Sequence, residues 1–272
     1  MTGSSPKTNG KVRLVASDLD GTLLRSDGSV SERTREALAR TLAAGIRFLL
    51  ASARSPAWLG LEARRLGLDG IGICANGALI YDFQRENILR HHPLEPALAH
   101  SLARDLRTAA PGIAFGCERP SGFVAEPAYR PLFRSPDSIP RAELEVLFAE
   151  PVTKLVLQHP DIAQHDLHAL VDELCGDNAV ATYSGAGLVE IAAAGVDKGS
   201  ALASICADLD IEAAEVVAFG DMPNDVSMLR WAGLGIAVAN AHADVVAAAD
   251  EITASNDEDG VALALERALS RD

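Results

Sequence analysis

Two aspartates separated by a single residue, Asp18 and Asp20, directly follow a short apolar run near the start of the sequence. A carboxylate at the end of a strand can attack an electrophilic phosphorus atom and form an aspartyl-phosphate. A second carboxylate two residues on can protonate the leaving oxygen and then take a proton from the hydrolytic water. Gly21 permits a sharp turn whose backbone amides face a phosphate. The spacing therefore predicts phosphoryl chemistry, with Asp18 as nucleophile and Asp20 as general acid and base. The same pattern also fits a calcium loop, but such loops follow helices.

Two further residues could bind the phosphate. Ser52 ends the apolar run Leu49–Ala51, where a hydroxyl can donate a hydrogen bond to a phosphoryl oxygen, although an ordinary helix N-cap has the same appearance. Lys198 stands at the start of a helical pattern, where a cation can hold both the phosphate and the nucleophile while charge moves between them. A solvated surface lysine is the alternative, and the flanking glycines at 195 and 199 favour the closer approach.

A second acidic group follows the apolar run Glu215–Phe219 and contains Asp221, Asn224 and Asp225. An anionic nucleophile approaches an anionic phosphate only where charge is neutralised. Magnesium prefers hard oxygen ligands and uses one or two carboxylates together with phosphate and water. Asp221 with Asp18 fits that description, so the sequence predicts a Mg²⁺ cofactor. An acidic helix cap is the alternative interpretation of the same residues.

Short apolar runs alternate with helical patterns in the segments that must position these residues. This alternation is typical of a parallel sheet with crossover helices, and such sheets bind ligands outside the carboxyl ends of their strands. The predicted class is α/β, with a doubly wound, Rossmann-like core. The predicted strands are Lys11–Ser17, Ile46–Ala51, Gly70–Cys74, Glu215–Phe219 and Leu234–Ala239, and the predicted helices are Ser31–Ala44, Ala57–Leu66, Asp197–Asp208, Asn224–Trp231 and Asp259–Leu269.

The middle of the chain has a different pattern. Prolines and polar clusters separate its apolar runs, and helical patterns at 96–109 and 162–175 mix with strand-like runs at 152–158 and 187–192. This mixture indicates an inserted α+β unit. The sequence therefore predicts a core domain of residues 1–83 and 187–272 and a cap domain of residues 84–186.

Composition narrows the possible partners. The 272 residues have a formal charge of −14, which argues against nucleic acid and anionic membranes as partners because affinity for phosphate backbones comes from Lys and Arg. No apolar run approaches the roughly 20 residues of a membrane-spanning helix, and Met1–Gly10 lacks the apolar stretch of a secretory signal. The four cysteines are widely spaced and are expected to be free thiols. These features predict a cytoplasmic protein.

In this order, the segments DLDGTLL (18–24), ASAR (51–54), ANGA (75–78), GVDKGSAL (195–202) and GDMPNDVSML (220–229) resemble the haloacid dehalogenase (HAD) superfamily. The resemblance is greatest to its Cof-type phosphatases, which carry a type IIB cap. It implies a phosphatase acting on small phosphorylated metabolites, of sugar-phosphate kind, with the cap setting specificity. One departure is Ala53, where the family usually has glycine.

The resemblance also implies roles for individual residues. By this resemblance Asp18 is the nucleophile and Asp20 the general acid and base. Asp18, the backbone carbonyl of Asp20 and Asp221 bind Mg²⁺, and Ser52, Lys198 and Asn224 bind the phosphate. The supporting residues are Gly21, Asn76, Gly77 and Asp225.

Three alternatives to a phosphatase remain open. A phosphomutase or another phosphotransferase would use the same residues and return the phosphoryl group to an acceptor. A receiver-like signalling domain shares the nucleophile, hydroxyl and lysine, but it lacks an acid at the position of Asp20 and has no cap. A binding protein without catalysis would not need the full set of acidic residues and lysine. The sequence predicts neither the substrate nor the oligomeric state.

Overall fold

The structure is a computed structural model, which describes residues 11–131, 139–184 and 187–269. It divides into two compact units, of which the first comprises residues up to Leu89 together with those from Asp197 on, and the second comprises Arg90–Val196. These boundaries differ from the predicted divisions after residues 83 and 186. The second unit ends at Val196 rather than at residue 186 because β10 (Val189–Ala193) pairs with β8 (Lys154–Gln158) and β9 (Ala179–Thr182) and so belongs to the sheet of the second unit.

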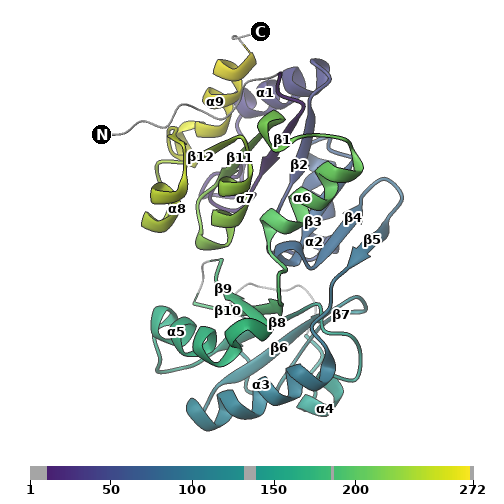
Figure 1. The fold of residues 1–272 in the computed structure, drawn as a ribbon, viewed down its shortest axis with the longest axis vertical. Helices are drawn as coiled ribbons and strands as arrows, with labels where there is room; N and C mark the ends of the chain where they lie inside the picture. The colour runs from purple at the N-terminus through teal and green to yellow at the C-terminus, as the bar shows by residue number, and fades with distance from the viewer. Residues whose placement is uncertain (1–10, 132–138, 185–186, 270–272) are drawn as a thin grey trace. The chain divides into compact units, whose positions relative to one another are not determined.

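A five-stranded parallel sheet forms the centre of the first unit, in the order β13-β12-β11-β1-β2 (Figure 1). A single parallel bridge between Ala51 and Ile73 links the end of β2 to β3. Strand β3 also begins a smaller sheet in the order β3-β4-β5. The strands of the first unit are β1 (Leu14–Ser17), β2 (Arg47–Leu50), β3 (Ile71–Cys74), β4 (Leu79–Asp82), β11 (Val216–Gly220), β12 (Leu234–Ala237) and β13 (Glu251–Ile252), and β5 (Asn87–His91) crosses into the second unit.

Alternate residues of the strands pack against two separate layers of helices. In β1, Val15 joins a buried cluster with residues of α1, α2 and α9, whereas Leu14 and Ala16 join another with residues of α6, α7 and α8. Successive side chains of a strand point to opposite faces of its sheet, so the apolar residues Leu14, Val15 and Ala16 need cover on both faces. These helices are α1 (Glu32–Ala43), α2 (Pro56–Arg65), α6 (Lys198–Asp208), α7 (Val226–Trp231), α8 (Ala243–Ala248) and α9 (Gly260–Leu269), and short 3₁₀ turns are η1 (Ala75–Gly77), η3 (Ala213–Glu215), η4 (Pro223–Asp225) and η5 (Asn256–Glu258).

Side-chain caps fix where the helices around the sheet begin. The Ser31 hydroxyl accepts a hydrogen bond from Thr34 N at 3.0 Å, which starts α1. Asp197 forms a capping box with Ser200, whose backbone N donates to the Asp197 carboxylate at 2.8 Å. Lys198 is therefore held at the first position of α6.

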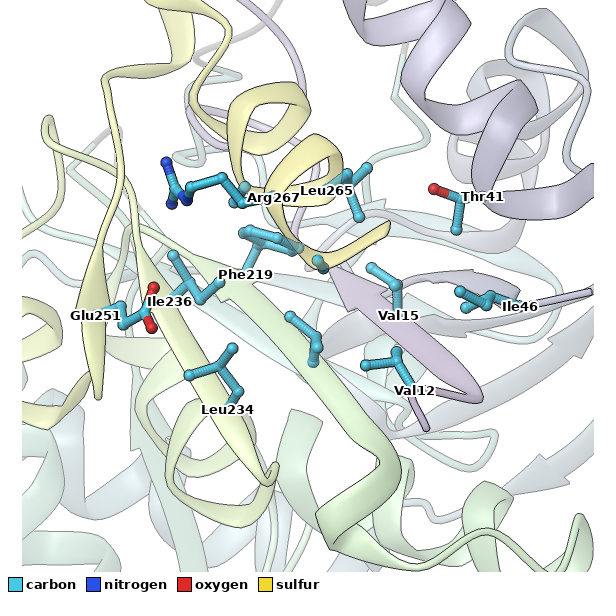
Figure 2. Close-up of a pocket in the computed structure, with 13 residues that line it drawn as sticks. Val12, Val15, Thr41, Ile46, Phe219, Leu234, Ile236, Glu251, Leu265 and Arg267 are labelled. Atoms are coloured by element: carbon cyan, nitrogen blue, oxygen red, sulfur yellow. The ribbon is translucent and has the colours of Figure 1, made fainter. Parts of the chain in front are cut away.

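A small apolar pocket of about 30 Å³ lies between the sheet and α9 (Figure 2). Val15 and Phe219 line it from the strands, and Leu265 lines it from the helix. This volume holds about one water molecule, so the pocket is a packing gap rather than a substrate site.

The second unit is an antiparallel sheet in the order β7-β6-β8-β10-β9. Buried residues of α3 and α5, such as Leu102 and Leu167, pack with Phe115 and Leu155 of the strands in a core of their own. The unit is thus α+β and is inserted into an α/β unit, and the predicted fold class is confirmed. None of the described helices is long and apolar enough to cross a membrane. The remaining elements are α3 (Pro96–Ala109), β6 (Ala114–Arg119), β7 (Gly122–Ala125), α4 (Leu144–Leu147), α5 (Gln164–Cys175) and η2 (Gly176–Asn178).

Candidate active site

The carboxyl ends of β1 and β11 form a topological switch point, where the order of strands along the chain reverses. From β1 the chain continues outward through β2 on one side, and from β11 it continues through β12 on the other. Asp18 follows β1, and its backbone N donates to Phe219 O at 3.0 Å. Asp221 follows β11 directly. The two carboxylates therefore come together at the place where an open α/β sheet binds its ligands.

Lys198 connects three segments of the chain at this point. Its side chain is fully buried, and Nζ lies 2.6 Å from Asp18 Oδ1 and 2.6 Å from Asp225 Oδ1. Burial alone would lower the pKa of the lysine, but the adjacent Asp18 and Asp225 carboxylates outweigh it and raise the pKa above its ordinary value. Lys198 is therefore a permanent cation beside the predicted nucleophile.

Asp225 holds this lysine and also shapes the loop after β11. Its Oδ2 accepts hydrogen bonds from Asp221 N and Met222 N, both at 3.0 Å, while its Oδ1 accepts from Lys198. A Cβ on Gly220 would lie 2.4 Å from Asp225 Cβ, so the loop closes this tightly only with glycine at that position. Both oxygens of Asp225 are engaged within the protein, which makes it a support for Lys198 and Asp221.

The Asp18 and Asp221 carboxylates concentrate negative charge in a buried site. Burial raises the pKa of Asp221 to about 6, aided by the charge of Asp225 and opposed by the hydrogen bond from Thr22. Burial also raises the pKa of Asp18 well above its ordinary range, although Lys198 opposes the shift. Oxygens of Asp18, Asp221 and Asp225 lie within 4.8 Å of one another. Buried carboxylates with raised pKa values and spare oxygens fit a hard divalent cation.

Thr22 and Gly21 fix the orientation of Asp221. Thr22 Oγ1 donates to Asp221 Oδ1 at 2.6 Å. Gly21 has a φ of +81°, and a Cβ there would lie 2.4 Å from Asp221 Oδ2. The turn after Asp20 therefore requires glycine both for its backbone conformation and for the approach of Asp221.

Gly77 determines how closely the turn η1 approaches α6. It has a φ of +104°, and a Cβ at this position would lie 2.3 Å from the carbonyl oxygen of Asp197. Asp197 is the N-cap that precedes Lys198. Gly77 thus acts on the site through the start of α6.

Asn76 and Asn224 meet beside the acidic residues. Asn224 Nδ2 donates to Asn76 Oδ1 at 3.0 Å, and Asn224 Oδ1 is buried without a hydrogen-bond partner among the described residues. Asn76 has a φ of 57°, and its backbone N donates to Ser52 O at 3.1 Å. The pair therefore links the loops after β2, β3 and β11, and it leaves one buried polar atom to be satisfied.

Ser52 is buried at the end of β2. Its Oγ accepts a hydrogen bond from Arg54 N at 3.1 Å, which fixes the oxygen and leaves the hydroxyl hydrogen as a donor. Ala53, the departure from the family pattern, lies in the turn between these two residues.

Asp20 lies in the loop after β1, two residues beyond Asp18, but makes a different contact. Its carboxylate accepts two hydrogen bonds from Arg54, from Nε at 2.8 Å and from Nη2 at 2.6 Å. The structure thus brings Asp18, Lys198, Asp221 and Asp225 into one cluster and directs Asp20 to Arg54. Sequence reasoning missed two of the residues in these contacts, Thr22 and Arg54. Both stand inside the motifs DLDGT and ASAR, where a threonine and an arginine next to predicted site residues were the available signal.

Comparison with known proteins identifies the family of the chain. The family of haloacid dehalogenase-like hydrolases matches residues 15–265, which is most of the chain. The chain belongs to the haloacid dehalogenase-like hydrolases. This hydrolase is 31% identical to the pyridoxal phosphate phosphatase YbhA of Escherichia coli over 92% of its length and 96% of that protein. It is 28% identical to a chloroplastic endoribonuclease YBEY of Arabidopsis thaliana, and there it spans only 46% of the relative's length.

Solved structures extend the comparison to the whole hydrolase fold. A haloacid dehalogenase-like hydrolase from Bacteroides thetaiotaomicron is 29% identical with a TM-score of 0.76, and the match covers 94% of this chain and 99% of that one. A HAD subclass IIB sugar phosphatase has a TM-score of 0.81 at 22% identity, covering 94% and 98% of the two chains, and supports the fold alone. The hydrolase is a Cof-type HAD phosphatase, as the sequence motifs predicted.

Proposed function

We propose that this phosphatase hydrolyses small phosphorylated metabolites through an aspartyl-phosphate on Asp18, with Mg²⁺ as cofactor. The observation that carries the proposal is the fully buried Lys198 ammonium, which contacts both Asp18 and Asp225 at 2.6 Å beside Asp221. A buried cation on a carboxylate with a raised pKa is costly for folding, and such groups concentrate at functional sites.

Asp18 attacks the phosphorus atom in the first step. Lys198 contacts Oδ1 of Asp18, and we assign the new P–O bond to the other carboxylate oxygen. The bond from phosphorus to the leaving oxygen breaks, and that oxygen takes a proton from Asp20. Lys198 stays charged throughout and faces the negative charge that develops on the phosphoryl oxygens.

Hydrolysis of the aspartyl-phosphate is the second step. Asp20, now a carboxylate, takes a proton from a water molecule as that water attacks the phosphorus. The bond to Asp18 breaks, which returns the Asp18 carboxylate and releases inorganic phosphate. One residue thus acts as acid and then as base, so the proton balance closes within one turnover.

Asp18, Asp221 and the backbone carbonyl of Asp20 would hold the Mg²⁺ ion. The ion would neutralise charge between the anionic nucleophile and the anionic phosphate. Asp225 is left as their support, because both of its oxygens already accept hydrogen bonds. The raised pKa of Asp221, about 6, supports the choice of that residue, because a bound cation would offset the burial and the Asp225 charge that raise it.

Ser52, Lys198 and Asn224 would bind the phosphate, and the turn at Gly21 would present backbone amides to it. Asn224 can act as a donor there, because Nδ2 gives one of its two hydrogens to Asn76 Oδ1 and keeps the second. Turning both amide groups over would let Asn76 donate to Asn224 Oδ1 and would satisfy the buried oxygen. Asn76 and Gly77 then act as supporting residues.

The substrate class is a small phosphomonoester. The similarity to a protein named a pyridoxal phosphate phosphatase supports a small phosphorylated metabolite rather than a macromolecule. The net charge of −14 supports the same conclusion, since it disfavours polyanionic partners. The four cysteines are all buried and form no disulfide in the described part of the chain, which supports a reducing, cytoplasmic location.

Turnover of p-nitrophenyl phosphate and of a panel of phosphorylated metabolites tests the proposal. Activity should need Mg²⁺ and disappear on chelation. Asp18→Asn should abolish turnover while the far-UV circular dichroism stays that of the wild type. Turnover that survives chelation would contradict the metal assignment, and an active Asp18→Asn variant would contradict the nucleophile. Transfer of labelled phosphate to an acceptor in place of water would identify a phosphotransferase.

A further inference from the structure

The Asp20 carboxylate is held at two points by a single arginine. Arg54 Nε donates to Oδ2 at 2.8 Å and Arg54 Nη2 donates to Oδ1 at 2.6 Å. This is the bidentate geometry in which a planar guanidinium fixes the plane of a carboxylate as well as its position. No other side chain in the described part of the chain hydrogen-bonds to Asp20, whose side chain is 52% exposed.

Arg54 is itself fixed on several sides. Its backbone N donates to Ser52 Oγ at 3.1 Å, and its carbonyl oxygen accepts from Ala75 N at 2.9 Å. Its remaining terminal nitrogen, Nη1, lies 3.6 Å from Glu62 Oε1 of α2. The guanidinium therefore stands between two carboxylates on a backbone that is tied to the ends of β2 and β3.

We propose that Arg54 is a positioning residue for proton transfer by Asp20. The inference rests on the proposed function. A general acid acts only when its oxygen is within about 3 Å of the leaving oxygen, and an exposed aspartate without a partner rotates among several orientations. The arginine removes that freedom: both oxygens accept from it in the carboxylate form, and in the acid form one oxygen still accepts from it while the other carries the proton. Two of its nitrogens face Asp20 and the third faces Glu62, so it acts through Asp20 rather than by binding the phosphate.

This role has a specific kinetic consequence. Alkyl phosphates have a leaving oxygen that must be protonated as the P–O bond breaks, whereas p-nitrophenolate leaves readily as an anion. Loss of Arg54 should therefore lower kcat/KM for alkyl phosphates and leave kcat/KM for p-nitrophenyl phosphate close to that of the wild type. A residue that binds the phosphate, or one that only stabilises the fold, would affect both esters equally.

The experiment compares Arg54→Ala, Arg54→Lys and the wild type on an alkyl phosphate and on p-nitrophenyl phosphate. We expect Arg54→Ala to lose roughly 10- to 100-fold in kcat/KM on the alkyl ester, which is less than the roughly 10²- to 10⁴-fold contribution of general acid–base catalysis because Asp20 itself remains, and less than about threefold on the aryl ester. Arg54→Lys should recover part of the loss, because an ammonium provides one contact and no fork. Arg64→Ala is the matched control. It removes an exposed arginine that lies on α2, the helix of Glu62, and pairs with Glu86, and it should leave kcat/KM unchanged on both substrates.

A double-mutant cycle separates action through Asp20 from direct action. In an Asp20→Ala background, adding Arg54→Ala should produce no further loss on the alkyl ester. A further loss there, or equal losses on the two esters in the single variant, would overturn the inference while wild-type turnover still supports the proposed function. Absence of wild-type turnover on both esters would overturn the proposed function and this inference together. Circular dichroism of each variant shows that the fold is retained.

Discussion

Replacing Asp221 by asparagine should stabilise the metal-free protein while abolishing its activity. The Asp221 carboxylate is buried close to Asp225, and these surroundings raise its pKa from 3.8 to about 6. In the unfolded chain the group is exposed and ionises near its ordinary pKa. Above pH 4 the unfolded state therefore binds fewer protons than the folded state, and wild-type stability falls as the pH rises until the folded group has also ionised.

The magnitude follows from the size of the pKa displacement. About two pH units correspond to roughly 3 kcal/mol of lost stability once the pH is well above 6. The amide introduced by Asp221→Asn would keep an oxygen that accepts from Thr22 Oγ1 and would carry no charge, so the variant should recover most of this free energy. For a unit of this size the gain corresponds to a rise of roughly 5–10 °C in Tm.

Urea and thermal unfolding in EDTA, followed by tryptophan fluorescence, measure this effect. Trp58 and Trp231 are the two tryptophans of the sequence, and both belong to the first unit, so the signal reports the unit that contains the site. The stability of Asp221→Asn should exceed that of the wild type at pH 8, and the difference should shrink as the pH falls to 4. Asp69→Asn, which neutralises an exposed carboxylate, is the matched control.

Addition of Mg²⁺ should make the wild type more stable than Asp221→Asn, the reverse of their order in EDTA. The wild type should gain stability as the ion concentration rises above its dissociation constant, and the variant should gain little. A variant no more stable than the wild type at pH 8 in EDTA would refute the reasoning. A stability difference that is the same at pH 4 and pH 8 would also refute it, because the gain would then not come from the charge.

Three further changes test other parts of the site. Lys198→Met should destabilise the protein by about 3–5 kcal/mol in urea unfolding and abolish turnover, because it leaves Asp18 and Asp225 buried without their cation; a loss below about 1 kcal/mol would contradict the role of the ion pair. Gly77→Ala should lower Tm and turnover together, since its Cβ would meet the Asp197 carbonyl at 2.3 Å, whereas Gly67→Ala, with nothing within 4 Å of its Cβ but also a positive φ, should lower Tm and spare activity. The four cysteines should resist Ellman's reagent in the native protein and react after denaturation, because they are buried and burial raises the pKa of Cys117 to about 12; rapid labelling of native protein would contradict this.

The sequence was most informative where chemistry and chain order depend on local patterns. The apolar run before Asp18 and the run before Asp221 predict strands, and strands β1 and β11 follow from them. Their meeting was expected because open α/β sheets bind ligands outside the carboxyl ends of their strands, and the strand order confirms that β1 and β11 are neighbours. The expected contact of Lys198 with Asp18 is present, and the roles of both residues in catalysis stay predictions.

Other features depended on packing that a single sequence does not reveal. Val189–Ala193 has the pattern of a strand, but nothing local indicates which sheet it joins, and it pairs with β8 and β9 rather than with the core. The contact between Asp20 and Arg54 joins the loops after β1 and β2, and its geometry depends on the rotamer of a long side chain. The close approach of η1 to α6, where a Cβ on Gly77 would lie 2.3 Å from the Asp197 carbonyl oxygen, joins segments more than a hundred residues apart.

The place of β1 between β2 and β11 has a consequence for how the protein is made. The hydrogen bond between Lys198 and Asp18 spans 180 residues, and the one between Thr22 and Asp221 spans 199. When the ribosome has made the opening segment of the first unit, β1 has only one of its two neighbours, β2. The other neighbour, β11, is made after the whole second unit. The second unit has its own core and can collapse while synthesis continues, which shortens the loop that must close. Chemical competence is therefore acquired late in synthesis, and a chain that stops before β11 has Asp18 without the Asp221 and Asp225 carboxylates that complete its site.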